Sequence, residues 1–430
     1  ITNMKFFCIT LGCKVNQYET EAITEKLCDS GLQHVEEIQK ADVIIINSCS
    51  VTATSDGKVR KSVNKAKREN PSAIIVLTGC MVQAFPDKSK EIPGVDIICG
   101  NVNKMLTTEY LSTFQKGNSS IVDVSNFQKE TPFEKMSINK FDGRTRAFVK
   151  IEDGCNRFCS YCIIPYARGR VRSKSIDDLK AEIQSLANNK YKEIVLVGIN
   201  LSCYGQDTGY TLCDAVETVC SVPGIERVRL GSLEPECLTP NVIKRLSMQK
   251  KLCNHFHISL QSGAANTLQN MNRHYTKDEF EQIVNNIRET FPNVAITTDI
   301  MVGFPGETSL DFEESLEFVK KIKFSQVHVF AYSRRSGTKA DLMPNQVAEY
   351  EKKLRSKKMC DLAQQLHKSF LQEQIGKIEQ VLFEREISPN LYEGHTSNYT
   401  TVHMISNNNL HNKIASVTLT PQNVLLENPH

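Results

Sequence analysis

The sequence predicts an α/β protein of three modules: an N-terminal domain with a parallel sheet, a central partial (β/α)6 barrel and a small C-terminal all-β module. Three observations predict this arrangement. Short β-rich runs alternate with polar helical stretches over residues 5–100, six further strand-and-helix repeats follow from residue 147, and short runs with turn residues occupy the chain after Gly376. Strands separated by helical crossovers favour parallel sheets, whereas closely spaced short strands favour an antiparallel module.

The composition is that of an ordinary globular chain. Of the 430 residues 40% are hydrophobic, and the net charge of +3 is too small to indicate nucleic acid by itself. No apolar run approaches the roughly 20 residues that a membrane helix needs, and the apolar segment near the start is too short for a signal. Fifteen cysteines in such a chain indicate metal or redox chemistry rather than disulfides. We therefore expect a cytoplasmic protein with no membrane partner.

The first part of the chain predicts a parallel sheet whose strand ends carry cysteines. The predicted strands span residues 5–12, 42–47, 73–79 and 95–100, with helices over 18–30 and 54–70. Cys13, Cys49 and Cys80 each follow directly after a strand. Because the carboxyl ends of parallel strands share one edge of a sheet, where ligands bind, we expect the three thiols to converge.

A second series of strands begins after a polar linker at residues 117–146. Its predicted strands span residues 147–153, 193–199, 227–233, 255–261, 295–301 and 326–332, with helices over 176–189, 277–290 and 349–374. Six β/α units make a partial barrel, short of the eight that close one. The C-terminal module has predicted strands at 379–383, 400–404 and 415–419, and the expected domain limits are 4–125, 142–372 and 373–430.

The loop after the first barrel strand carries the strongest chemical signal. Cys155, Cys159 and Cys162 have C-x3-C-x2-C spacing. Three thiolates this close can hold three corners of a [4Fe–4S] cubane, which leaves the fourth iron open to the amine and carboxylate of an amino acid. Zinc is the alternative, but it would need a fourth Cys or His, and the nearest histidine in the sequence is His255.

These motifs resemble a known family. Residues 154–173 are similar to the signature of the radical S-adenosylmethionine superfamily and, in their second half, to its methylthiotransferase branch. Residues 10–21, 47–52 and 78–83 around the strand-end cysteines agree, as do residues 259–263, 298–308 and 328–333. Residues 11–21 and 162–169 most resemble the branch that acts on N6-threonylcarbamoyladenosine at position 37 of tRNA.

The resemblance implies two [4Fe–4S] clusters and S-adenosylmethionine as cofactors. One cluster would lie on Cys155, Cys159 and Cys162, and an auxiliary one on Cys13, Cys49 and Cys80. A radical made from S-adenosylmethionine would take hydrogen from C2 of the adenine, and sulfur carried by the auxiliary cluster, once methylated, would join that carbon. Because the cofactors carry this chemistry, no side chain is predicted to act as a general acid or base.

The implied partners are the anticodon stem-loop of tRNA, an electron donor such as flavodoxin or ferredoxin, and a sulfur source. Three alternatives stay open. The branches that modify isopentenyladenosine in tRNA or an aspartate of a ribosomal protein share the expected fold. A non-catalytic RNA-binding protein, stabilised by an iron–sulfur or zinc site, would need neither an open iron nor a nucleotide site.

Strand-end positions predict the nucleotide contacts. Asn200, Ser232 and Glu234 are candidates for the ribose or the amino group, and Tyr161 for the border of the adenine. Each would serve equally well as a cap or turn residue.

Two basic segments are candidates for RNA binding. The loop after the cluster cysteines carries Arg168, Arg170 and Arg172, and the helix near residue 60 carries Lys58, Arg60 and Lys61. Such charges neutralise phosphates, although a charged helix is often only a solvated face. The C-terminal module resembles a TRAM domain, which the family uses to hold tRNA, but it contains few basic residues.

Overall fold

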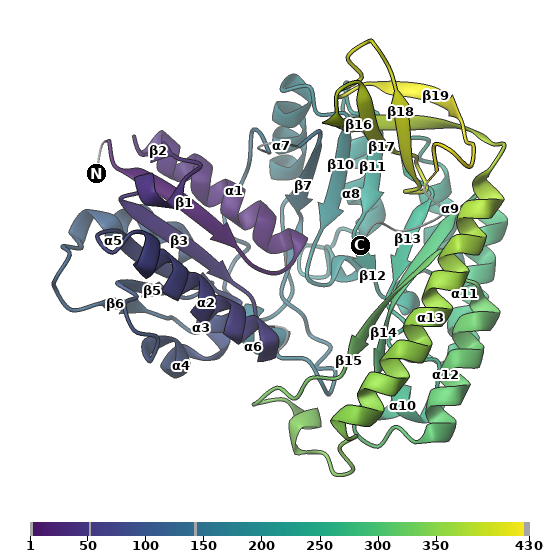
Figure 1. Ribbon diagram of the computed structural model, residues 1–430, viewed down its shortest axis with the longest axis horizontal. Coiled ribbons are helices and arrows are strands. Elements are labelled where there is room, and N and C mark those ends of the chain that lie inside the picture. The colour runs from purple at the N-terminus through teal and green to yellow at the C-terminus, as the bar shows by residue number, and fades with distance from the viewer. Residues whose placement is uncertain (1–2, 51–52, 142–143, 425–430) are drawn as a thin grey trace.

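The computed structural model describes residues 3–50, 53–141 and 144–424 (Figure 1). It has the three predicted parts: an N-terminal α/β domain, a central half-barrel and a C-terminal β module. The domain limits 4–125, 142–372 and 373–430 stay predictions, and residues 51–52, 142 and 425–430, which enter those predictions, lie outside the described residues. Among the described residues, no helix is long and apolar enough to cross a membrane.

The N-terminal domain is a six-stranded parallel sheet in the order β2-β1-β3-β4-β5-β6. Its strands are β1 (Lys5–Thr10), β2 (Gln33–His34), β3 (Val43–Ser48), β4 (Ile74–Gly79), β5 (Ile97–Cys99) and β6 (Ile121–Asp123), and its helices are α1 (Lys14–Asp29), α2 (Ala53–Glu69), α3 (Cys80–Ala84), α4 (Pro86–Lys90) and α5 (Thr107–Thr113). The four predicted strands are confirmed. The segment predicted to be a linker contributes β6, which pairs with β5 at the sheet edge.

The central part consists of two sheets, β11-β10-β7 and β12-β13-β14-β15. Their strands are β7 (Arg146–Lys150), β10 (Glu193–Val197), β11 (Arg227–Leu230), β12 (Ser232–Leu233), β13 (His255–Ile258), β14 (Ala295–Val302) and β15 (Gln326–Ala331). A small antiparallel pair, β8 (Glu152–Asp153) and β9 (Arg172–Ser173), flanks the cysteine loop. The partial barrel is confirmed, but the strand predicted over 227–233 is split at Gly231, where one sheet ends and the next begins.

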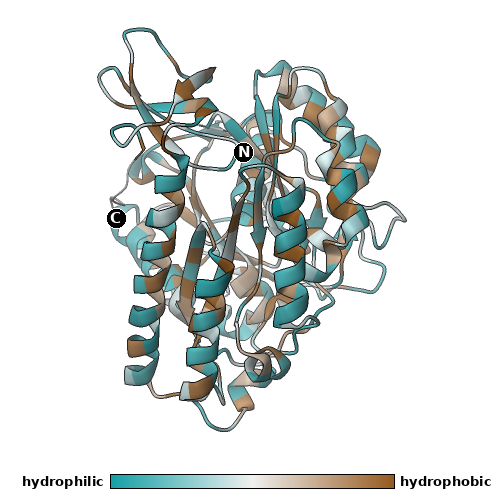
Figure 2. Cartoon of the chain, turned by 90° about the vertical axis from the view of Figure 1, so that its right-hand side faces the viewer, coloured by the Kyte–Doolittle hydropathy of each residue, from teal (hydrophilic) through white to brown (hydrophobic). Residues whose placement is uncertain are grey.

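Helices cover the outer face of this half-barrel (Figure 1). They are α7 (Ile176–Asn188), α8 (Leu212–Ser221), α9 (Pro240–Ser247), α10 (Ala265–Asn270), α11 (Lys277–Thr290), α12 (Ser309–Ile322) and α13 (Glu349–Gln374), whereas the short helix α6 (Ile164–Arg168) lies against α3. Helix α13 has the bounds that the sequence predicts. Figure 2 shows the helices on that side with mostly hydrophilic residues outward and hydrophobic ones interleaved, as expected for helices that bury one stripe.

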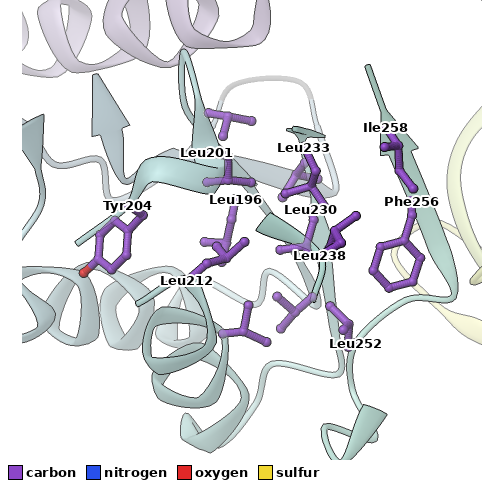
Figure 3. Close-up of a cluster of buried hydrophobic side chains, with 14 of the residues drawn as sticks. Leu196, Leu201, Tyr204, Leu212, Leu230, Leu233, Leu238, Leu252, Phe256 and Ile258 are labelled. Carbon is purple, nitrogen blue, oxygen red and sulfur yellow. The ribbon is translucent and has the colours of Figure 1, made fainter. Parts of the chain in front are cut away.

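Period-two alternation in the strands separates the core from the barrel interior. In Figure 3, Leu196, Leu230 and Phe256 of successive strands lie in one buried layer. Burying each such side chain stabilises the fold by roughly 1.5–3 kcal/mol. Neighbouring residues point the other way: in β13, Phe256 and Ile258 are fully buried, whereas His255 and His257 are only partly buried. The strands therefore present apolar residues to the helices and polar ones to the interior.

The C-terminal module is a four-stranded antiparallel sheet in the order β18-β17-β16-β19. It comprises β16 (Ile378–Ser388), β17 (Leu391–His395), β18 (Thr401–Ile405) and β19 (Ile414–Thr418), which confirms the predicted all-β module. It packs on the amino ends of the barrel strands, where Arg227 donates a hydrogen bond to the carbonyl of His395 (2.9 Å) and Arg229 donates one to that of Ser397 (2.9 Å).

Candidate active site

Three thiols meet at one edge of the N-terminal sheet. Cys13 precedes α1, Cys49 follows β3, and Cys80 begins α3 directly after β4. Gly12, with φ of +103°, lets the chain pass so close that a Cβ atom there would lie 3.0 Å from Sγ of Cys49. The structure therefore places the three cysteines at the carboxyl-end edge of the sheet.

This group of thiols suits a metal cluster. All fifteen cysteines of the chain are free thiols, and Cys49 and Cys80 are buried while Cys13 is exposed. Thiols gathered in this way ionise readily only when a cation joins them, which is the behaviour of cluster ligands. A cluster held by three cysteines keeps one iron open to exchange.

The second set of thiols lies on the loop between β8 and α6. The loop starts at Gly154, whose φ is +81°, and a Cβ atom there would lie 2.0 Å from the carbonyl oxygen of Arg170, so only glycine fits. Burial, and then the neighbouring thiol of Cys159, raise the pKa of Cys162 to about 12. Asn200 donates to Cys155 (3.7 Å) and Arg273 donates to Cys159 (3.3 Å), contacts that stabilise sulfur carrying negative charge.

A cavity of about 250 Å³ opens directly beside this loop. It is lined by Tyr161, Cys162, Ile163, Ile164, Gln261, Asp299, Met301, Phe330, Ala331, Tyr332 and Ser333. Mostly apolar walls with a few polar groups are typical of a nucleoside site. Gln261 has φ of +69°, a rare backbone conformation for this residue type, and its carbonyl accepts a hydrogen bond from the backbone N–H of Met301 (2.8 Å).

The predicted nucleotide contacts occupy different places around the loop. Tyr161 lines the cavity. Asn200 is buried, and its Oδ1 has no hydrogen-bond partner, so an acceptor is available for a ligand ammonium. Glu234 is bound by Arg273 at 2.5 Å, whereas Ser232 is exposed and lines none of this cavity.

Three residues of this region were not predicted: Gln261, Asp299 and Arg273. Gln261 follows β13 and Asp299 lies within β14, both inside motifs that the sequence already marks, 259–263 and 298–308. Those motifs were the available signal. No local pattern marks Arg273, because its contacts to Cys159 and Glu234 are made across 114 and 39 residues of chain.

The interior of the half-barrel is polar and rich in cations. Strand register places Glu193 beside Arg146, and Asp299 beside His328. Lys14 enters this space from the start of α1, with its ammonium 5.7 Å from the ring centre of Phe148. Partial desolvation among the barrel residues and the guanidiniums of Arg146 and Arg229 lower the pKa of Lys14 to about 8.

Arg168 joins the two groups of cysteines. It ends α6, six residues after Cys162, and is fully buried. Its Nε–H donates to Sγ of Cys80 (3.1 Å), and Nη1 donates to Glu19 (2.5 Å) and lies 3.2 Å from a carboxylate oxygen of Asp153. Asn101 spans the same junction, donating to the carbonyl of Ala167 (2.7 Å).

The predicted phosphate contacts of Arg168 and Arg172 are therefore wrong. Arg168 is committed to buried carboxylates, and Arg172, 4% exposed, donates to the carbonyl of Arg168 (2.7 Å) and stacks on Phe127 at 4.6 Å. A charge enclosed and paired in this way is not available to a ligand outside. Arg170 is exposed and stays a candidate.

Lys58, Arg60 and Lys61 are exposed on α2. Val59 and, one turn further along the helix, Val63 are fully buried. This is the amphipathic pattern of a surface helix, and it suits both a solvated face and an RNA contact.

The fold and the cysteine loop define a radical S-adenosylmethionine enzyme. A family model described as Radical SAM superfamily matches residues 149–319, and one described as Uncharacterized protein family UPF0004 matches residues 5–100. A solved radical S-adenosylmethionine methyltransferase, TsrM of Kitasatospora setae, matches with a TM-score of 0.59 over 79% of this chain and 77% of its own, at 13% identity. The cobalamin-dependent radical enzyme OxsB matches with a TM-score of 0.51 over 84% of this chain and 56% of its own, at 12% identity. These structures share the fold.

Curated relatives narrow the class. The threonylcarbamoyladenosine tRNA methylthiotransferase MtaB of Bacillus subtilis is 38% identical, over 95% of this chain and 92% of its own. MtaB of Aquifex aeolicus is 37% identical, over 87% of this chain and 91% of its own. The tRNA-2-methylthio-N(6)-dimethylallyladenosine synthase of Clostridium tetani is 38% identical, over 96% and 93%. The chain belongs to the tRNA methylthiotransferase family of radical S-adenosylmethionine enzymes, whose cofactors are [4Fe–4S] clusters and S-adenosylmethionine.

Proposed function

We propose that this enzyme methylthiolates C2 of N6-threonylcarbamoyladenosine at position 37 of tRNA and uses two [4Fe–4S] clusters to do so. The observation that carries the proposal is the junction at Arg168. One side chain contacts Cys80 of the N-terminal domain and belongs to the helix that follows Cys162 of the barrel. The helix that follows one set of thiols is thereby in contact with the other set, which supports a methylthiolation in which one site activates a carbon and the other brings sulfur to it.

In this proposal Cys155, Cys159 and Cys162 hold one cluster, and Cys13, Cys49 and Cys80 hold the other. When bound, these groups supply reductive cleavage of S-adenosylmethionine and delivery of sulfur. The chain orients the reactants and excludes water. The cavity beside Cys162 receives the nucleoside of S-adenosylmethionine, with Asp299 and Gln261 as its polar contacts. No side chain is assigned as general acid or base.

The choice of substrate rests on the polarity of the barrel interior. An isopentenyl group is apolar, and burying cations against it without partners is costly. A threonylcarbamoyl group carries a carboxylate. The barrel interior suits this charge, because it contains two imidazoles and the cations of Lys14, Arg146 and Arg229. Relatives with the two activities are almost equally identical to this chain, so overall similarity alone does not decide between them.

The remaining partners follow from the same proposal. An electron donor such as flavodoxin or ferredoxin reduces the loop cluster, a sulfur source replenishes the auxiliary one, and the TRAM-like module contributes to holding the anticodon stem-loop. A tRNA substrate implies action in the cytoplasm.

Nucleoside analysis of tRNA tests the proposal. The gene is introduced into a strain that lacks its own tRNA methylthiotransferases but makes both modified adenosines, and tRNA hydrolysates are analysed by mass spectrometry. We expect 2-methylthio-N6-threonylcarbamoyladenosine to form. Exclusive methylthiolation of isopentenyladenosine would overturn the substrate, and an absence of both products, with a ribosomal-protein aspartate modified instead, would overturn the tRNA function.

A further inference from the structure

One cation in the barrel interior lacks a partner. Glu193 faces three guanidiniums, those of Arg146, Arg227 and Arg229, at 3.8, 3.7 and 2.8 Å, and of these Arg146 also pairs with Glu384. Lys14 is exposed in the same space, and no carboxylate of the described residues lies within ion-pair distance of its ammonium. The interior therefore carries positive charge that the described side chains do not neutralise.

The carboxylate of Asp299 in the barrel interior is already engaged. Asp299 lies 3.2 Å from Nε2 of His257, and the other ring nitrogen of that histidine is 2.9 Å from the hydroxyl of Thr297. The ring of His328, exposed on β15, lies 5.8 Å from that of His257. Because Asp299 is held by His257, Lys14 keeps a charge that a carboxylate entering the interior can neutralise.

The position of Lys14 in the chain is equally informative. It follows Cys13, an expected ligand of the sulfur-delivering cluster, and is the first residue of α1. On adenine, C2 and the carbon that bears N6 both adjoin N1, so they lie on one edge of the base. A residue that binds the N6 substituent must therefore lie near the group that brings sulfur to C2. Lys14 meets this requirement by sequence adjacency.

We propose that Lys14 forms a binding subsite for the carboxylate at the end of the N6 substituent, and that this contact selects the charged nucleoside over apolar ones. The inference rests on the proposed function, since it names the contact by which that substrate is chosen. A charge-assisted hydrogen bond in a partly buried site is worth roughly 1.5–3 kcal/mol, or about tenfold to a hundredfold in affinity.

The test pairs a change in the protein with a change in the RNA. Anticodon stem-loops that carry N6-threonylcarbamoyladenosine, its methyl ester, or isopentenyladenosine are titrated against wild-type holoenzyme and the Lys14→Met and Lys14→Arg variants. Esterification removes only the carboxylate charge. We expect it to weaken binding to the wild type about tenfold or more and to leave binding to Lys14→Met unchanged, with Lys14→Arg in between.

Controls separate this contact from general attraction of RNA and from damage to the cluster. Lys353→Met removes the same charge from the exposed face of α13 and should leave the effect of esterification at the wild-type value. Iron content and absorption spectrum establish that Lys14→Met retains its clusters. An equal loss on esterification in wild type and Lys14→Met would overturn the subsite. Tighter binding of the isopentenyl stem-loop by the wild type would instead overturn the proposed substrate.

Discussion

Nε of Arg168 lies 3.1 Å from Sγ of Cys80, across 88 residues of chain. The contact joins the helix after the radical loop to the strand-end thiols of another domain. The same guanidinium meets Glu19, which also binds Lys104 at 2.5 Å and Lys150 at 2.8 Å. All four of these charged side chains are fully buried, so the junction between the domains contains a paired ionic network beside the apolar contacts that Val15, Tyr18 and Ala22 make with the barrel core.

The first prediction concerns the stability of that network. Arg168→Met leaves the carboxylates of Glu19 and Asp153 with less compensation, and removing one partner of a buried ionic group costs roughly 3–5 kcal/mol. We expect urea unfolding to show that the free energy of unfolding of this variant is lower than that of the wild type by this amount. The matched change Arg170→Met, at an exposed position two residues away, should alter the free energy of unfolding by less than about 0.5 kcal/mol. Equal changes in the free energy of unfolding for Arg168→Met and Arg170→Met would contradict a stabilising role of the network.

The second prediction concerns metal content. Anaerobically reconstituted protein should bind about eight iron atoms if two cubanes are present. Replacing Cys155, Cys159 and Cys162 together by Ala should halve the iron, because the other three thiols lie on a separate sheet edge. Iron unchanged in this variant would contradict the assignment, and stoichiometric zinc in the untreated wild type would favour the zinc alternative.

The third prediction separates the two sets of thiols by function. A variant with Ala at Cys13, Cys49 and Cys80 should still form 5′-deoxyadenosine from S-adenosylmethionine after reduction, but it should yield no methylthio product. Radical formation needs only the loop cluster, whereas sulfur delivery needs the other. Liquid chromatography with mass spectrometry measures both products in one assay. Full methylthio product from this variant would make the strand-end cysteines merely structural.

The fourth prediction concerns RNA binding. Arg170 is exposed just beyond the cysteine loop, so Arg170→Ala should weaken tRNA binding and lower the slope of log K against log salt by about one unit. The triple change of Lys58, Arg60 and Lys61 to Ala on α2 provides the comparison. If those residues form only a solvated face, their removal should leave the slope unchanged. The reverse pattern would move the RNA contact to α2.

The fifth prediction concerns the docking of the C-terminal module at acid pH. Burial alone would raise the pKa of Glu384, but the hydrogen bond with His395 (2.8 Å) and the guanidinium of Arg146 lower it to about 2. A carboxylate whose pKa is lowered on folding stabilises the protein above its unfolded value, near 4.3, and this contribution fades as pH falls toward the folded value.

The matched variant is Glu384→Gln. In urea unfolding of the reduced apoprotein at pH 6, the free energy of unfolding of the wild type should exceed that of the variant by up to about 3 kcal/mol. The gap should narrow progressively below about pH 4. A gap that stays constant between pH 6 and pH 3 would show that the charge of Glu384 does not hold the module.

The sequence by itself determined the architecture and the two sets of thiols, because both depend on local pattern. Alternating strands and helices imply a parallel sheet, and a cysteine directly after each of three strands must lie at one sheet edge. The spacing within residues 155–162 confines the second set to one loop. The bounds of α13 followed from sequence periodicity for the same reason.

Only the tertiary structure decided which charges are buried and what they meet. Arg168 stands in a basic loop and reads as a phosphate contact, yet Glu19 and Asp153 enclose it. Glu19 is 149 residues away, and the burial of a long side chain depends on such distant partners rather than on its neighbours in sequence. Likewise, Lys14 is an unremarkable lysine until the barrel wall surrounds it with cations and imidazoles. Electrostatic roles depend on the summed field of groups that folding brings together, and no local pattern encodes that sum.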